Sequence, residues 1–146
     1  NQFDFLQLAF LIAQDPPANN TYQTATTLVQ SDSYSTQTQG DLTNATNSND
    51  FDISSGCIDT YYNSSQSYAD VWYKATVPAL ENSLLNSAVS GSVLDDTAII
   101  AYTLNEGVLT EIACNNSSRF SKIEMSGQAE NTVIYVMVFN NFNAYH

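Results

Sequence analysis

Side chains that could carry out catalysis are few in this chain, and they are poorly placed to act together. His146 is the only histidine and stands last in the sequence, where a general base is hard to position. Serines are abundant, but a serine nucleophile needs a histidine or a lysine beside it to accept its proton. Asp95 and Asp96 are adjacent, so on an extended strand their carboxyl groups point to opposite faces, unlike a glycosidase pair. The sequence therefore predicts that the protein is not an enzyme.

Oxygen-rich loops could instead bind a hard cation such as calcium. The carboxylates that could take part are Asp50, Asp52, Asp95 and Asp96. None of them stands in the spacing of an EF-hand loop, which needs a glycine and a terminal glutamate. Solvated loop carboxylates are the simpler interpretation, so we expect no cofactor and keep calcium as the alternative.

Several asparagines stand in Asn-x-Ser/Thr sequons, the acceptor sequence for N-glycosylation. Asparagine, serine and threonine are so frequent in this chain that chance supplies several such triplets, so the signal is weak. O-glycosylation of the loops rich in serine and threonine is equally open. The five candidate asparagines are Asn19, Asn44, Asn63, Asn115 and Asn116.

The charge balance restricts the partners that we expect. Asp and Glu total 15 and Lys and Arg total 3, which gives a net charge of -12. Such a surface repels phosphate backbones and anionic lipids, so neither nucleic acid nor a membrane is an expected partner. Charged residues are only 12% of the chain, and Asn, Gln, Ser and Thr supply the solubility instead. This composition is typical of extracellular proteins.

Two cysteines, Cys57 and Cys114, permit one disulfide bond but do not prove it. In an exported protein the bridge would close a long loop and would stabilise the fold by roughly 4 kcal/mol in the chain-entropy model. Two buried free thiols are the alternative.

Short apolar runs separated by turn residues predict an antiparallel β-sandwich. Residues 133–139 are apolar on both faces, as in a central strand, and residues 97–104 have the same character. Asn105-Glu106-Gly107 should turn the chain into a strand over 108–114, which makes the clearest hairpin of the sequence. The remaining expected strands cover residues 69–77, ended by Pro78, and residues 122–126, with one wet face.

The first thirteen residues are strongly apolar and precede a linker that contains Pro16 and Pro17. Chain ends usually fray into solvent, so an apolar end needs something to cover it. The segment divides the chain into an extension strand with its linker, residues 1–15, and a sandwich domain, residues 16–146. The first two phenylalanines share one face of an extended strand, whereas the large apolar residues at positions 6, 8, 10 and 12 share the other, which indicates a bulge or burial on both faces. These apolar residues are Phe3, Phe5, Leu6, Leu8, Phe10 and Ile12.

Four motifs in order give the chain a resemblance to a known family. They are Pro-Pro-Ala-Asn-Asn-Thr at 16–21, Asp-Val-Trp-Tyr-Lys-Ala-Thr at 70–76, Leu-Asp-Asp-Thr-Ala-Ile-Ile-Ala-Tyr at 94–102 and Ala-Cys-Asn-Asn at 113–116. Together they resemble the bacterial pre-peptidase C-terminal domain family and its relatives in secreted and surface proteins of Bacteroidetes. The resemblance implies a jelly-roll-like sandwich, location outside the bacterial cell or on its surface, and a cysteine pair like Cys57 and Cys114.

The chain departs from this family at its last strand. In the family a final apolar strand follows the tyrosine-rich strand that residues 133–140 resemble. Here that final strand is absent after residue 140, and residues 1–10 resemble it closely. We therefore expect the sandwich's final strand at the front of the chain.

A sandwich that lacks one strand has an open groove, which an extended apolar segment can fill by strand addition. We expect this groove beside the strand that carries Val133, Tyr135, Met137 and Phe139. A segment donated by a neighbouring copy makes a head-to-tail contact, and such contacts build filaments when the rotation does not close. Folding back within one chain and a unit of a longer tandem-repeat chain are the alternatives.

The sequence thus predicts a structural subunit of an extracellular filament or pilus-like surface fibre, a homopolymer assembled by donor-strand complementation from copies of itself. The alternative is an accessory carbohydrate- or protein-binding module of a secreted enzyme or adhesin. Exposed tyrosines favour recognition, so Tyr61, Tyr62 and Tyr68 would be its candidate contact surface, although packing over a sandwich edge is the simpler interpretation.

Overall fold

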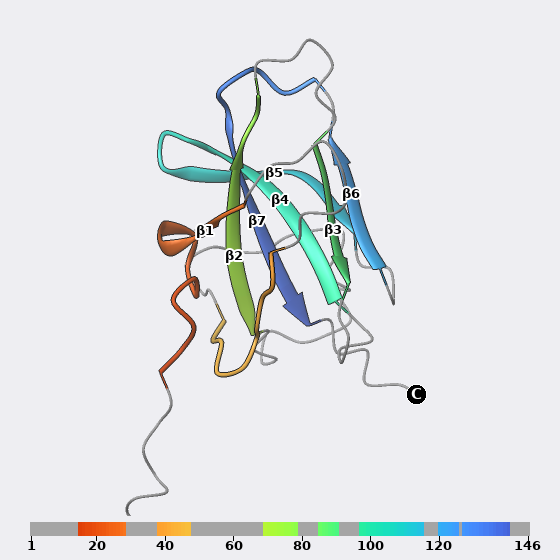
Figure 1. The fold of residues 1–146 in the computed structure, drawn as a ribbon. Coiled ribbons are helices and arrows are strands. Elements are labelled where there is room, and N and C mark those ends of the chain that lie inside the picture. The colour runs from red at the N-terminus through yellow and green to blue at the C-terminus, as the bar shows by residue number, and fades with distance from the viewer. Residues whose placement is uncertain are drawn as a thin grey trace, which may run out of the picture.

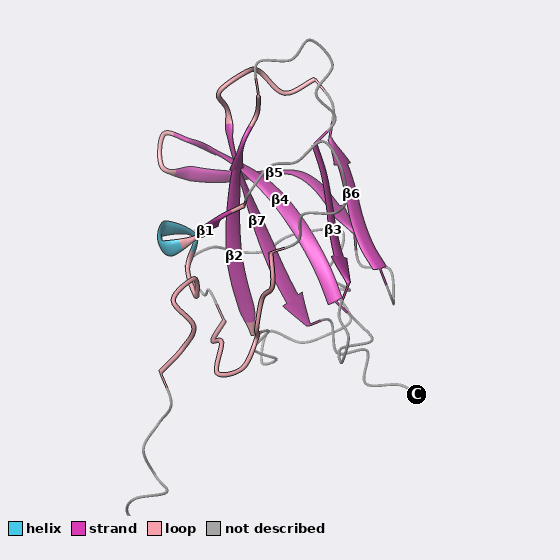
Figure 2. Ribbon diagram, viewed as in Figure 1, coloured by secondary structure: helices cyan, strands magenta, loops and turns pink. Residues whose placement is uncertain are grey.

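The computed structural model describes residues 15–28, 38–47, 69–78, 85–90, 97–115, 120–125 and 127–140. In these ranges the chain forms strands and a single 3-10 turn, so the protein is all-β, as predicted (Figure 1, Figure 2). The elements are η1 (Tyr22–Thr24), β1 (Thr26–Thr27), β2 (Asp70–Thr76), β3 (Leu85–Ser90), β4 (Thr97–Asn105), β5 (Val108–Asn115), β6 (Phe120–Met125) and β7 (Val133–Asn140). The expected extension strand, residues 1–13, lies outside the described residues.

The larger sheet has five strands in the order β1-β2-β7-β4-β5. Its members from β2 to β5 are antiparallel neighbours, whereas β1 pairs with β2 in parallel through two residues. The sheet is therefore mixed and not wholly antiparallel as predicted, because the short β1 lies along β2 in the same direction. A smaller antiparallel sheet consists of β3 and β6.

The strong sequence patterns predicted these strands well. Residues 133–139 do form a central strand, and the expected hairpin is β4 and β5 joined by Glu106 and Gly107. Residues 22–27, for which no local pattern is decisive, form the short turn η1 and the short strand β1. The sequence reasoning missed β3, because its residues Leu-Asn-Ser-Ala-Val-Ser contain few large apolar side chains.

One face of the larger sheet carries the first of two apolar cores. Val71 of β2, Ile99 of β4 and Val136 of β7 belong to this core, and β6 adds Ile123 and Met125 from the smaller sheet. The smaller sheet thus packs over the β4–β5 side, as its contacts with these strands also indicate. Over β2 the cover comes from the described loops, through Leu28, Leu42 and Ala45. Two sheets therefore share one core, while a complete jelly-roll-like sandwich stays a prediction.

The opposite face of the larger sheet carries the second core. Trp72, Ile100, Met137 and Phe139 are the large side chains there, and at most 1% of each is exposed. Tyr22 of η1 packs against this core. Both faces of β7 are therefore buried, which explains why its sequence is apolar throughout.

The turn between β4 and β5 depends on backbone conformation. Glu106 has a φ of 50° and Gly107 a φ of 81°, so both central residues are in the left-handed region that a two-residue type I′ hairpin requires. No heavy atom lies within 4 Å of the position that a Cβ on Gly107 would take, so a side chain there would meet no steric obstacle.

We expect Gly107→Ala to lower the free energy of unfolding by about 1 kcal/mol, the conformational cost of a left-handed alanine. Glu106→Asn should raise it by a few tenths of a kcal/mol, because asparagine tolerates this region better. Urea unfolding followed by tryptophan fluorescence measures both changes. An alanine variant as stable as the wild type would contradict this turn geometry.

Candidate functional site

The strand expected to border a groove, β7, has no free edge. Its residues from 133 to 139 pair with β2 along one edge, and residues 134 to 140 pair with β4 along the other. The prediction that another strand pairs beside β7 is therefore wrong. A fully apolar strand is equally compatible with the centre of a sheet and with the border of a groove, so its sequence did not distinguish them.

The four predicted groove residues do share one face, but it is the face of the second core. Met137 and Phe139 are buried among Trp72 and Ile100, Tyr135 is half-buried, and Val133 is 37% exposed. The smaller sheet packs on the opposite face, where β7 presents Ile134, Val136 and Val138. A segment that joined the smaller sheet would face Ile134, Val136 and Val138 of the first core, and not the four predicted groove residues.

An aromatic cluster organises the second core around Trp72. Tyr22 meets Trp72 edge-on with ring centres 6.0 Å apart, and Tyr102 lies tilted against it at 5.6 Å. Tyr22 also meets Tyr135 edge-on at 5.7 Å. Asp70, which is 1% exposed, accepts a hydrogen bond of 2.8 Å from the Trp72 indole nitrogen. The sequence held a signal for this pair, because residues two apart on a strand share a face.

The outer edge of β2 is occupied by hydrogen bonds to irregular segments. The amide of Trp72 donates to the Asn19 carbonyl, and the Asn19 side-chain amide donates back to the Trp72 carbonyl. The amide of Asp70 donates to the Thr46 carbonyl, and the amide of Leu28 donates to the Lys74 carbonyl. This edge of the larger sheet is therefore closed to another strand.

The smaller sheet is different, because within the described residues β3 and β6 pair only with each other. Their ladder runs from Leu85↔Met125 to Ser90↔Phe120. Neither the outer edge of β3 nor that of β6 has a strand partner in the part of the chain that the structure describes. The outer edge of β5 in the larger sheet likewise has no strand partner among the described residues.

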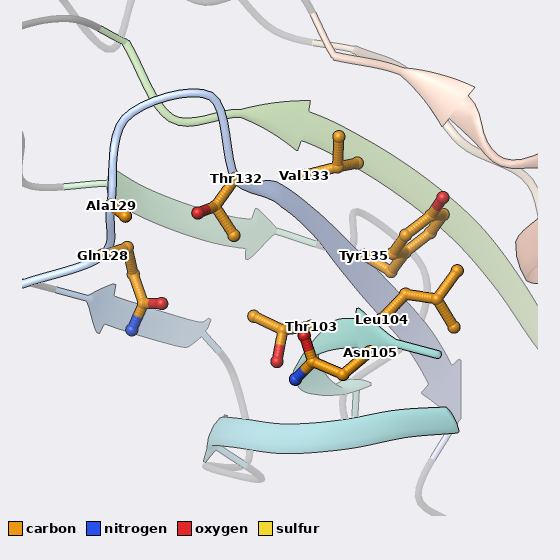
Figure 3. Close-up of a pocket in the computed structure, with 8 residues that line it drawn as sticks. All are labelled: Thr103, Leu104, Asn105, Gln128, Ala129, Thr132, Val133 and Tyr135. Carbon is orange, nitrogen blue, oxygen red and sulfur yellow. The ribbon is translucent and has the colours of Figure 1, made fainter. Parts of the chain in front are cut away.

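A pocket of about 510 Å³ opens where β4 and β7 separate. The two strands pair as far as Thr103↔Ile134, and beyond this pair β4 continues into its hairpin while β7 stays with β2. Figure 3 shows Tyr135 and Leu104 side by side at one end of the pocket and Gln128 and Ala129 at the other. The complete lining is Thr103, Leu104, Asn105, Gln128, Ala129, Thr132, Val133 and Tyr135.

Apolar exposure gathers at this end of the sheet. The exposed large apolar residues of the described ranges are Leu104, Val108 and Val133, and two of them line the pocket. The sequence reasoning missed this site, because its walls come from two strand ends and a loop that no local pattern joins.

The other predicted site residues are only partly described. The calcium candidates Asp50, Asp52, Asp95 and Asp96 lie outside the described residues, as do Cys57, Tyr61, Tyr62 and Tyr68. Within the described ranges no group of three acidic, cysteine or histidine side chains could hold a metal ion. No helix in these ranges is long and apolar enough to cross a bilayer.

The described sequon asparagines differ in how accessible they are. The Asn19 side chain holds the edge of β2, so its amide nitrogen already serves the fold. Asn44 is exposed in a turn with a φ of 60°, and Asn115 is half-buried at the end of β5. Asn63 and Asn116 lie outside the described residues. Of the three described, Asn44 is the most accessible to glycosylation.

Comparisons of the chain with protein-family models, with curated proteins and with solved structures find no match.

Burial in the aromatic cluster makes the protein sensitive to alkali. Burial of the Tyr102 phenol raises its pKa well above the ordinary value, and the nearby carboxylates of Glu111 and Asp70 raise this pKa further. An unfolded tyrosine loses its proton at a pH of about 10. Stability is therefore fully present below that pH and declines above it, because only the unfolded chain releases the proton readily.

We expect Tyr102→Phe to reduce this alkaline loss of stability. Between pH 7 and pH 11 both proteins should lose unfolding free energy. The loss should be about 1.4 kcal/mol smaller in the variant than in the wild type. Urea unfolding at both pH values measures the difference. Identical losses in the two proteins would mean that Tyr102 titrates normally in the folded state.

Proposed function

We propose that the protein is a structural subunit of an extracellular filament or surface fibre, assembled by strand exchange between copies. The donor is the apolar segment 1–13, and the acceptor is the outer edge of β3. The observation that carries the proposal is the two-stranded sheet of β3 and β6, whose outer edges have no partner among the described residues.

A two-stranded sheet is marginally stable in water, and three or more strands or packing against other elements are needed to hold it. Here the pair packs on one side of a sheet of five strands. A third strand would add a hydrogen-bonded ladder to the smaller sheet and more apolar cover to the core that both sheets share. Of the two described sheets, the smaller one therefore gains more from complementation.

β3 is a better acceptor than the other edges. Proteins block an edge with charged side chains, prolines or bulges, and the β3 sequence from Leu85 to Ser90 has neither a charge nor a proline. β6 carries Lys122 and Glu124. The outer strand β5 carries the exposed Glu111 beside a register shift in its pairing with β4.

The donor segment has the composition that strand addition requires. Main-chain hydrogen bonds supply affinity, and alternate side chains that enter pockets supply specificity. Each apolar side chain that it buries contributes about 1.5–3 kcal/mol. Because donor and acceptor are different parts of the same surface, the contact is head-to-tail and builds a filament when it does not close. The resemblance to the pre-peptidase C-terminal domain family supports the extracellular location.

We expect deletion of residues 1–13 to abolish filaments in negative-stain micrographs and to increase hydrogen exchange at the β3 amides. A synthetic peptide of residues 1–13, added in excess, should restore slow exchange in β3 without restoring filaments. The reason is that a free peptide fills the groove but links no neighbour. Truncated protein that still forms filaments, or unchanged β3 exchange, would contradict the proposal.

Two single substitutions separate specific insertion from general stickiness. In an extended donor Leu8 and Gln7 point to opposite faces. Leu8→Asp places a charge among buried side chains and should prevent assembly, whereas Gln7→Asp adds the same charge one residue away and should weaken assembly less. Equal effects of the two changes would indicate an unspecific contact.

The disulfide between Cys57 and Cys114 belongs to the same proposal, because an extracellular location favours it. Cys114 is half-buried on β5 and packs against the second core. We expect no thiol to react with Ellman's reagent in the denatured, unreduced protein. Reduction should lower the free energy of unfolding by about 4 kcal/mol. Two reactive thiols per chain would show that the bridge is absent.

A further inference from the structure

The pocket between β4 and β7 has walls that the fold holds in place. On one side the β4–β5 hairpin is closed by the pair Asn105↔Val108. On the other side the loop before β7 is fastened to the segment after β2, because Val77 donates to the Thr132 carbonyl and accepts from the Asn131 amide. The Thr132 amide donates to the Ala129 carbonyl, which closes a turn with Asn131 at a φ of 65°. A ligand would therefore meet a preformed site.

The lining combines the phenol ring of a tyrosine, two amides and two threonine hydroxyl groups. Tyr135 supplies the ring, Asn105 and Gln128 supply the amides, and Thr103 and Thr132 supply the hydroxyls. Amides and hydroxyls both donate and accept hydrogen bonds, so they suit a ligand whose own groups do both. Leu104 and Val133 add apolar surface beside the ring. Its volume of about 510 Å³ is within the usual range for small-molecule sites.

Charge decides between ligand classes. No ionisable group other than the Tyr135 phenol lines the pocket, and the exposed Glu106 and Glu130 follow the lining residues Asn105 and Ala129 in the chain. With a net charge of -12 on the whole chain, an anionic ligand would be repelled. A cationic ligand would find no carboxylate in the lining itself.

We propose that this pocket binds a neutral saccharide. A sugar ring offers C–H groups to Tyr135 and Leu104, and its hydroxyls exchange hydrogen bonds with Asn105, Gln128 and the threonines. The side chains of an apolar peptide could not hydrogen-bond to these amides and hydroxyls, so such a peptide is the less suitable occupant. The site adds a binding activity to the fibre, and it is independent of strand exchange at β3.

Isothermal titration of the full-length protein tests the proposal. The ligands are three neutral oligosaccharides, cellohexaose, mannohexaose and xylohexaose, and one anionic oligosaccharide, a hexameric alginate fragment. We expect at least one neutral oligosaccharide to bind with a Kd of about 1 mM or tighter and the alginate fragment to bind more weakly. No neutral binding at that level, or tighter binding of the alginate fragment, would overturn the proposal.

Matched variants locate the site. Asn105→Ala and Gln128→Ala should each weaken binding by about fivefold, the effect of one lost hydrogen bond. Gln39→Ala removes an exposed amide that is outside the lining and should change the Kd less than about twofold. Unchanged binding in both pocket variants would place the sugar elsewhere. A peptide of residues 1–13 that displaced the sugars and bound with a lower Kd than any of them would assign the pocket to the donor segment instead.

Filament formation separates this test from the earlier one. Micrographs of Asn105→Ala and Gln128→Ala should show filaments like those of the wild type, because neither residue belongs to the β3 edge. Loss of filaments in both variants would show that the pocket serves assembly and would overturn its assignment to a saccharide.

Discussion

The rest of the structure depends on the position of β7 between β2 and β4. A strand that is apolar on both faces is stable only where other elements cover both of those faces. β7 meets this condition, since Ile134 and Val136 face one core while Met137 and Phe139 face the other. The neighbouring strands β2 and β4 also bury both faces, and their alternating side chains extend both cores across the sheet.

The two layers are unequal in the part of the chain that the structure describes. Five of the described strands lie in one sheet and two in the other, while loop residues such as Leu42 cover the side of the core over β2. The long outer edge of β2 is closed by the side chain of Asn19 and by backbone bonds, whereas β3 keeps an uncharged edge. The proposed strand addition would therefore use the edge of β3 and not that of β2.

The second core encloses a polar group together with a hydrogen-bond donor from its own strand. Asp70 is almost fully enclosed, and the indole of Trp72 gives it a hydrogen bond within the same strand. Tyr22 and Tyr102 enclose the indole, so η1, β2 and β4 all meet at one residue. From this cluster Tyr135 extends to the pocket, where it becomes half-exposed. The core and the proposed saccharide site are therefore one continuous aromatic arrangement.

The sequence by itself determined which segments are strands wherever the pattern was strong. Alternation and β-branched residues predicted β2, β4, β5 and β7, and the Glu106-Gly107 turn predicted the hairpin of β4 and β5. It could not predict β3, whose short and weakly apolar sequence is a strand only because β6 pairs with it.

Only the tertiary structure decided where the strands lie relative to one another. The apolar run at 133–139 was correctly placed at the centre of a sheet, but the groove beside it was not, because pairing partners are distant in sequence. The pocket could not be predicted for the same reason. Asn105 and Gln128 line it together because β4 and β7 diverge there, and no sequence motif joins the two residues. Local side-chain patterns determine strand formation, whereas long-range pairing determines which edges and cavities remain open.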